Sequence, residues 1–416
     1  MNKPGKKIPC SYRFVTSPGL ELLLKREITG LVPGISSSVR IGSGVLDLSQ
    51  SPNLSGLNAK LLDGIISRVA LRSKLTKRVY VSLGSEASVQ WEKQMREVLS
   101  MCPWGTFYYK AAGMPEVKVK SANSRIFAPK YVTELVQEAF RNFKGHSVDS
   151  NLSLESMADD ATRSAPVYVR IDRDKLNVSI DAIGGSLNSQ GLEPFKKNSR
   201  LDLDEVTAVG CIMRSLVPAL GGFSERTTLW DPFCGNGVLP LMVSSVLADL
   251  PAGSPAAPYM FRSFPRYSER DFASVVNSLV LNAHPKCHLI TVLGTDASCE
   301  AIKVANRNLI KFRSQLPSLE GRDLIPFDVQ FQRVFDAYSP PAGDVFITTA
   351  LPVQGDTERK YLHFHKMINL LEGRLKGAFV VTSKWNQFRK LSPRRWITEL
   401  RFFDGRRQVE VLKLAS

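Results

Sequence analysis

The fold is decided by one stretch of the sequence, which reads Thr228-Leu-Trp-Asp-Pro-Phe-Cys-Gly-Asn-Gly-Val-Leu-Pro240. A short apolar run leads to an acid, Asp231, and the chain then turns through Gly235 and Gly237. The apolar segment that follows, 238–250, indicates a helix. A strand that passes through a glycine turn into a helix presents backbone N–H groups to a nucleotide-like ligand. Ordinary strand-to-helix turns share this pattern, so its function depends on its surroundings.

Strands and helices alternate around this stretch in the second half of the chain. Helices are expected at 203–217, 301–312 and 367–375, and strands at 289–296, 329–332, 344–349, 377–382 and 409–414. This alternation predicts parallel βαβ units in a doubly wound sheet. Ligands of such sheets bind beyond the carboxyl ends of the strands, which is where Asp231, Asp296 and the turn at 348–355 fall.

The first 190 residues indicate a smaller-scale α+β arrangement. Strands are expected at 12–16 and 106–111, hairpins at 38–48 and 167–181, and helices at 20–28, 57–69, 87–99 and 131–143. Basic residues gather between these elements, at Arg72, Lys74, Lys77 and Arg78 and again at Lys118, Lys120, Arg125 and Lys130. Such clusters form either a solvated face or a surface that binds RNA.

Length and charge narrow the class of protein further. A chain of 416 residues is expected to form two or three domains. Lys and Arg number 55 against 39 acids, a net charge of +16 that favours a nucleic-acid partner. The six cysteines are scattered without a Cys-x-x-Cys pair, so we expect neither disulfides nor a metal site. No apolar run approaches the ~20 residues that span a bilayer, and no secretory signal is recognisable. We therefore expect a cytoplasmic protein without a membrane partner, with the nucleus or an organelle as the alternative.

The residues at the sheet edge suit a nucleoside that carries an amino acid. Asp296 is placed to accept bonds from ribose hydroxyls, or alternatively to cap the helix that follows it. Gly235 and Gly237 allow a close approach of the ligand, and Asp231 suits a cationic amino group. No phosphate-binding lysine follows the glycines, which excludes a Walker loop. S-adenosylmethionine (SAM) meets these requirements and is the cofactor we expect.

The segment from Asp231 to Pro240 resembles the SAM-binding motif of the THUMP-domain rRNA methyltransferases, which include bacterial enzymes that methylate guanine in large-subunit rRNA. Weaker likenesses follow in the family's order, including 14–27, 67–72, 251–265 and 294–308. The resemblance implies a ferredoxin-like module at 1–69, a THUMP-like RNA-binding domain at 70–190 and a Rossmann-type methyltransferase domain at 200–416. The implied cofactor-binding residues are Asp231, Pro232, Cys234, Gly235, Gly237, Asp296, Ala297 and Asp336.

The turn after the fourth strand departs from that family. The family carries Asn-Pro-Pro-Tyr there, in which Asn accepts bonds from an exocyclic base amine and the aromatic ring stacks on the flipped base. This chain carries Ala350, Leu351, Pro352 and Val353 at the catalytic position. Two functions therefore stay open. One is a SAM-dependent methyltransferase acting on a base amine of rRNA or tRNA, and the other is an RNA-binding protein with a decayed catalytic turn, for example a ribosome assembly factor.

Overall fold

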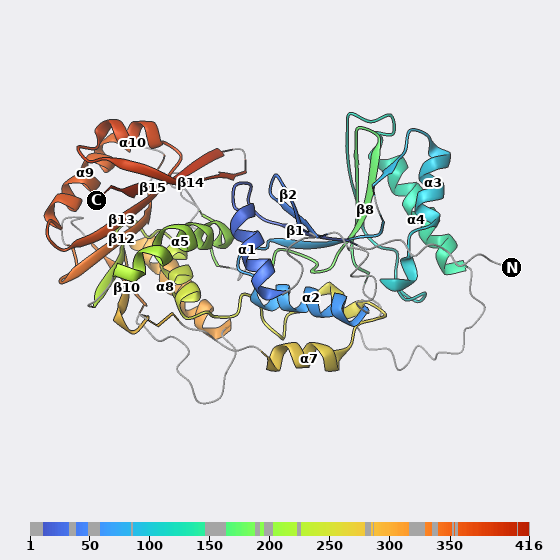
Figure 1. The fold of residues 1–416 in the computed structure, drawn as a ribbon, viewed down its shortest axis with the longest axis horizontal. Coiled ribbons are helices and arrows are strands. Elements are labelled where there is room, and N and C mark those ends of the chain that lie inside the picture. The colour runs from blue at the N-terminus through green and yellow to red at the C-terminus, as the bar shows by residue number, and fades with distance from the viewer. Residues whose placement is uncertain are drawn as a thin grey trace.

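The computed structural model describes the chain in segments, and all structural statements refer to these residues. They are 11–32, 39–48, 59–84, 86–145, 164–187, 192–194, 203–222, 226–278, 284–285, 287–315, 329–334, 340–351, 353, 357–405 and 407–415. The described elements form two sheets, one in each half of the chain, with helices packed against both (Figure 1).

The N-terminal half contains an eight-stranded sheet in the order β2-β3-β1-β4-β8-β7-β6, with β5 paired to β8. Its strands are β1 (Ser11–Val15), β2 (Val39–Gly42), β3 (Val45–Leu48), β4 (Arg78–Ser82), β5 (Ala87–Ser88), β6 (Val117–Ala122), β7 (Val167–Asp172) and β8 (Lys175–Asp181). Because β4 pairs with both β1 and β8, one sheet runs across the expected boundary at residues 69 and 70. The division of this half into two domains stays a prediction.

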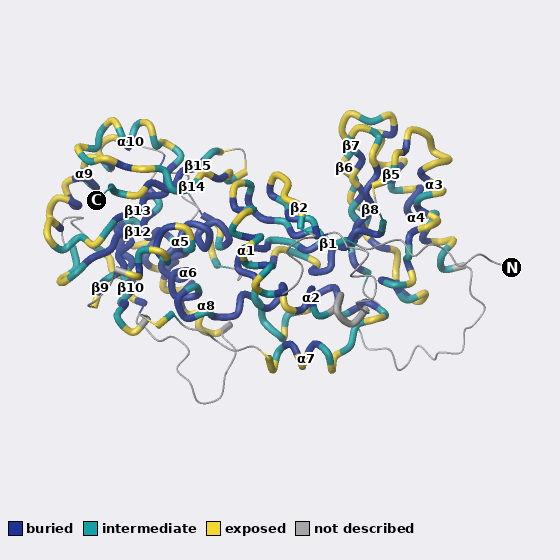
Figure 2. Tube along the Cα trace, in the orientation of Figure 1, coloured by how far each residue is buried: buried dark blue, intermediate teal, exposed yellow. Residues whose placement is uncertain are grey.

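Four helices accompany this sheet, and alternate residues of its strands point toward the core. They are α1 (Glu21–Leu31), α2 (Ala59–Arg72), α3 (Glu92–Ser100) and α4 (Pro129–Gly145). In β1, Tyr12 and Phe14 are buried while their neighbours are half-exposed, as a strand with one buried face requires. Figure 2 shows this core as the buried centre of the half.

The prediction of a strand at 106–111 is wrong. Residues 104–106 form a 3₁₀ turn, and the aromatic side chains that suggested a strand fill the core instead. The hydroxyl of Tyr108 donates to the carbonyl oxygen of Ala165 at 2.7 Å, and its ring meets that of Phe140 edge to face. The strand of this region is β6, eleven residues further on, which pairs in parallel with β7.

The C-terminal half is a doubly wound sheet of seven strands in the order β11-β10-β9-β12-β13-β15-β14. β9 (Thr227–Asp231), β10 (Ile290–Asp296), β11 (Val329–Arg333), β12 (Asp344–Ala350) and β13 (Leu375–Thr382) are parallel. The hairpin of β14 (Trp396–Asp404) and β15 (Arg407–Leu414) completes it in the antiparallel sense. This arrangement confirms the fold class expected from the alternation of strands and helices.

Helices cover both faces of this sheet. One core gathers residues of α5 (Glu205–Ala219), α6 (Val238–Leu247) and α8 (Cys299–Gln315), whereas α9 (Thr357–Leu370) and α10 (Trp385–Leu391) contribute to the other. Alternate residues of β12 enter the two cores, Phe346 the first and Val345 and Ile347 the second. The helix expected at 367–375 is α9, which begins ten residues earlier. The helix expected at 203–217 is α5, which extends past Pro218 to Ala219.

The segment that follows α6 in the C-terminal half packs against the N-terminal half. After α6 the chain runs to α7 (Glu269–Asn277), which packs against α2 (Figure 1). The backbone N–H of Ala252 donates to Leu71, and those of Met260 and Phe261 donate to Ile183 and Ala182. The two halves are therefore joined by backbone hydrogen bonds as well as by side chains. Among the described residues, no helix is both long and apolar enough to cross a membrane.

Candidate cofactor site

The glycine turn lies between β9 and α6 and is fastened to the end of β10. Gly235 and Gly237 have positive φ angles of 56° and 81°, and Gly237 is the N-cap of α6. The N–H of Cys234 donates to the carbonyl of Thr295 at 3.0 Å, and the N–H of Gly235 donates to the Asp296 carboxylate at 3.1 Å. The predicted strand, turn and helix are thus present, at the carboxyl ends of two neighbouring strands.

The ring of Phe331 in β11 occupies the space that side chains at Gly237 and at Gly294 of β10 would need. A Cβ atom at Gly237 would lie 2.6 Å from the Phe331 ring, and one at Gly294 would lie equally close. The ring is 9 % exposed and belongs to the core. The absence of a side chain at Gly237 therefore serves packing beneath the turn, in addition to any approach of a ligand from above.

Asp231 is 2 % exposed and holds two turns together. Its Oδ1 accepts a bond from the backbone N–H of Phe233 at 3.1 Å and another from the hydroxyl of Thr349 at 2.6 Å. Thr349 lies near the end of β12, so the carboxylate links the glycine turn to the turn at 350–353. The Thr349 side chain is fully buried, which removes it from contact with a substrate base.

Asp296 is 1 % exposed and accepts two backbone bonds, from Gly235 and from Ser298 at 2.8 Å. The alternative role that we considered for it, as the cap of the next helix, is performed by Ser298, whose hydroxyl accepts from the N–H of Ala301 at 3.3 Å. Ala297, between them, is exposed. Asp296 thus fixes the shape of the turn, and a contact with a ribose stays a prediction.

Residues 192–194 lie against the glycine turn, an arrangement that sequence analysis missed. The buried side chain of Asn308 in α8 donates to the carbonyls of Glu193 and Asn236 and accepts from the N–H of Glu193 at 2.7 Å. Arg307, the preceding residue, pairs with the Glu193 carboxylate at 2.8 Å. Residues 192–194 are therefore fastened to the glycine turn through Asn308.

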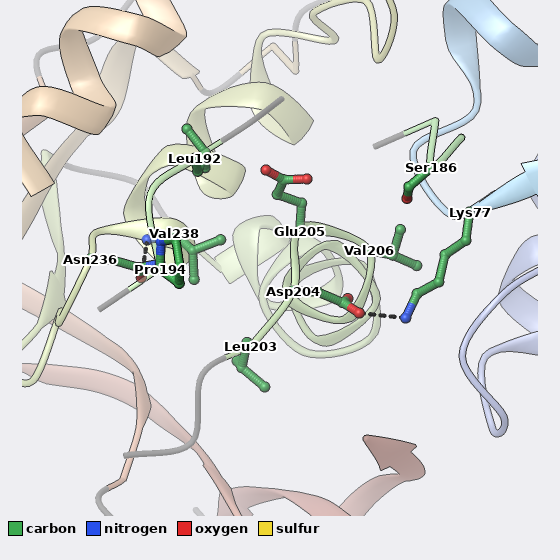
Figure 3. Close-up of a pocket in the computed structure, with 10 residues that line it drawn as sticks. All are labelled: Lys77, Ser186, Leu192, Pro194, Leu203, Asp204, Glu205, Val206, Asn236 and Val238. Carbon is green, nitrogen blue, oxygen red and sulfur yellow. Dashed lines mark hydrogen bonds and ion pairs between the residues drawn. The ribbon is translucent and has the colours of Figure 1, made fainter. Parts of the chain in front are cut away.

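A cavity of about 390 Å³ opens beside the turn, between the two halves of the chain (Figure 3). Its walls come from the N-terminal half, the 192–194 segment, the start of α5 and the start of α6. Its lining residues are Lys77, Ser186, Leu192, Pro194, Leu203, Asp204, Glu205, Val206, Asn236 and Val238. Cavities of this size accept small-molecule ligands and cofactors.

Charged groups of both halves meet at this cavity. Lys77 forms an ion pair with Asp204, the N-cap of α5, which also accepts from the N–H of Thr207 at 2.8 Å. Burial alone would raise the pKa of Asp204, but Lys77 and Thr207 outweigh it and lower that pKa. In Figure 3 the Glu205 side chain lies between those of Leu192 and Val206. The cavity is therefore lined by charges of both signs, of which Lys77 and Asp204 pair with each other.

The turn expected to be catalytic is apolar where the structure describes it. Ala350 is half-buried, while Leu351 and Val353 are 0 % and 4 % exposed and belong to the cores. The N–H of Leu351 donates to the carbonyl of Val381 at 2.9 Å. Pro352 and Asp336 lie outside the described residues. In the described part of this turn, no side chain can accept a bond from a base amine.

The structure brings most of the expected cofactor residues into one place. Pro232 and Cys234 are buried within the turn, beside Asp231, Gly235 and Gly237, and Asp296 accepts from the N–H of Gly235. Across the described segments, no group of three or more His, Cys, Asp or Glu residues is arranged to hold a metal ion.

Comparison with known proteins finds similarity to methyltransferases in sequence and in fold. No family model matches the chain. Its sequence is 24% identical over 302 residues to the ribosomal RNA large subunit methyltransferase K/L of Vibrio parahaemolyticus and 23% identical over 296 residues to that of Legionella pneumophila. These matches cover 71% and 70% of this chain but only 38% of each relative. The chain is thus a distant relative that spans about two fifths of their length.

Solved structures match over almost the whole chain. A possible methylase from Clostridium difficile 630 has a TM-score of 0.73 at 17% identity, and SMU.472, solved in complex with SAH, has 0.72 at 15%; each match covers 98% of both chains. TrmN from Thermus thermophilus has 0.62 at 14% identity, over 98% of this chain and 99% of that one. The expected fold class, a Rossmann-type methyltransferase domain preceded by an α+β region, is confirmed.

Proposed function

We propose that this chain is a SAM-dependent RNA methyltransferase that acts on an exocyclic base amine of rRNA or tRNA. The observation that carries this proposal is the glycine turn of β9 and α6, bonded to Asp296 and opening onto a cavity of about 390 Å³. The distant relatives that methylate ribosomal RNA and the solved relative that holds SAH support it. SAM would supply an electrophilic methyl group at this site.

The residues present fit such a cofactor. The helix N-terminus of α6 and the positive-φ turn leave backbone groups without intervening side chains, as close contact with a nucleoside requires. Asp231, Pro232, Cys234, Gly235 and Gly237 would form the turn beside the cofactor, and Asp296 and Ala297 would lie toward its nucleoside. Asp336, which lies outside the described residues, stays an expectation from the resemblance. The charged wall of the cavity, formed by Glu205 and the Lys77–Asp204 ion pair, would lie near the amino-acid part of the cofactor.

A second function is favoured by the turn at 350–353. An acceptor of the base amine is worth about 10²–10³ in rate, and Ala350 offers none. The aromatic position holds Val353, which is buried and cannot stack on a base. The second candidate is therefore an RNA-binding protein, such as a ribosome assembly factor, that keeps the methyltransferase fold without the reaction.

Transfer of a labelled methyl group from SAM to RNA separates the two candidates. Wild-type protein is compared with Ala350→Asn, and Ala256→Asn, at an exposed position, serves as the control. The proposed enzyme labels RNA without any substitution. Labelling by Ala350→Asn alone would contradict it and identify a decayed site, because the substitution restores only the missing acceptor.

A further inference from the structure

Large aromatic side chains stand exposed at the far end of the N-terminal half. Trp91 is 60 % exposed and Phe127 is 72 % exposed, whereas Trp104, Trp230 and Trp396 are all buried. Tryptophan is highly buried on average in folded proteins, so this degree of exposure is unusual. Figure 2 shows exposed chain around α3 and the neighbouring strands, on the side away from the glycine turn.

We call the four exposed side chains Trp91, Arg125, Phe127 and Tyr131 the aromatic platform; they come from the start of α3 and from the segment that leads into α4. The Arg125 guanidinium lies 4.9 Å from the centre of the Trp91 ring, a cation–π contact. Tyr131, at the start of α4, shares a side-chain hydrogen bond with Glu92, the residue after Trp91. Phe127 lies in the loop between Arg125 and Tyr131. These residues thus belong to one surface.

The platform is held in place by buried neighbours and loop bonds. Ile126 points into the core, so Arg125 and Phe127 on either side of it are turned outward. The N–H of Arg125 donates to Asp174 at 2.8 Å, and Asp174 accepts through its carbonyl from Val89, two residues before Trp91. A surface fixed in this way loses little conformational freedom when a ligand binds.

Lys93 and Lys130 flank the platform in the sequence. Both are exposed within two residues of Trp91 and Tyr131. Of the acids close by, Glu92 pairs with Arg96 at 2.7 Å and Asp174 accepts from the N–H of Arg125. Exposed aromatic rings with adjacent cations are the combination that binds single-stranded nucleic acid, because every base has a face that stacks. A duplex hides those faces, and an apolar protein partner would not require the cations.

We propose that the aromatic platform stacks unpaired RNA bases while Lys93 and Lys130 contact the phosphates. This inference deepens the proposed function and rests on it, because RNA is the partner proposed there. It assigns the recognition of single strands to a surface of the N-terminal half, away from the glycine turn. The RNA would reach the cofactor site only if it spans both halves.

The test measures the affinity of the full chain for a short oligouridylate and for an RNA duplex of the same length. Replacing the rings by Trp91→Ala and Phe127→Ala together should weaken single-strand binding by about tenfold or more, since each stack contributes substantially. Duplex affinity should stay unchanged. Leu22→Ala and Ile310→Ala, at positions 68 % and 70 % exposed, are matched controls for removing an exposed apolar side chain.

Salt dependence distinguishes stacking from charge. The aromatic double variant should keep the wild-type salt slope, whereas Lys93→Ala and Lys130→Ala should each reduce it by about one unit. Wild-type affinity in the double variant would overturn the proposal and leave this surface to a partner protein. An equal loss for duplex RNA would overturn it as well. If the wild-type chain binds neither RNA, the proposed function itself fails.

Discussion

Gly237 is subject to two constraints that act through different physics. Its φ of 81° disfavours any residue with a Cβ, and that Cβ would also lie 2.6 Å from the Phe331 ring. Gly373 has the same φ of 81° with open space around it, so it carries the first constraint alone. The pair therefore separates backbone strain from packing at the turn on which the proposed function depends.

The first prediction compares alanine substitutions at these two glycines. Gly373→Ala should lower the free energy of unfolding by about 1–2 kcal/mol, the cost of a left-handed residue. Gly237→Ala should cost a further amount of about 1–3 kcal/mol, because the core beneath it has no room for a methyl group. Urea denaturation measures both. Equal losses would show that Phe331 yields to the new side chain.

At the scale of elements, the sequence predicts a helix or strand correctly where its apolar residues are the ones that the fold buries. The strand, glycine turn and helix at 227–247 were predictable because apolar runs and glycines lie next to one another in the sequence. The aromatic run at 106–111 predicts a strand that is absent, because rings that suit a strand also suit a core, as the buried Tyr108 shows. α7 has no counterpart among the predicted elements, although its buried Phe272 and Val275 are spaced as on one face of a helix, because nine residues are too few for a distinct pattern.

The site itself was predictable only in part. Asp231, Gly235, Gly237 and Asp296 come together because parallel strands end at the same edge of the sheet. The bond between Asn308 and Glu193, which are 115 positions apart, leaves no trace in the local sequence. The cavity between the halves likewise depends on packing that no single segment encodes.

The second prediction concerns the packing of α9 against α10. His365 is 4 % exposed, its ring lies 4.8 Å from that of Phe388, and burial lowers its pKa to about 4, with the charge of Arg394 acting in the same direction. Between about pH 6.5 and 4, His365 is therefore protonated in the unfolded chain and neutral in the folded chain.

Stability contributed by neutral His365 is full above pH 6.5 and is lost as the pH falls toward 4. The loss has a limit of about 1.4 kcal/mol per pH unit. His365→Phe, which keeps a ring and cannot be protonated, should remove this component. Unfolding free energies of both proteins at several pH values measure it, and parallel pH profiles would contradict the assignment.

At the scale of the whole molecule, Asp249 joins the two halves. It follows α6 and pairs with Arg72 at 2.7 Å and with Lys74 at 3.5 Å, side chains that are only 15 % and 9 % exposed. Burial lowers the pKa of Lys74, and the Asp249 charge opposes that effect. Removing the carboxylate leaves two largely buried cations without its compensation.

The third prediction is that Asp249→Asn lowers the free energy of unfolding by about 2–3 kcal/mol. Asparagine retains the positive φ of 51° at this position, so backbone strain does not contribute. Glu300→Gln, in the exposed pair with Lys303, should change it by less than about 0.5 kcal/mol. Similar effects at both positions would argue against the ion pairs of Asp249 as a source of stability.

The central claim, that the turn at 231–237 and its cavity form a SAM site, is tested most directly by calorimetric titration of the purified chain with SAM. The account predicts saturable binding that weakens by at least about tenfold in Leu192→Trp, which fills the cavity, and is unchanged in Leu22→Trp, on the exposed face of α1. No binding of SAM by the wild-type protein would contradict the account.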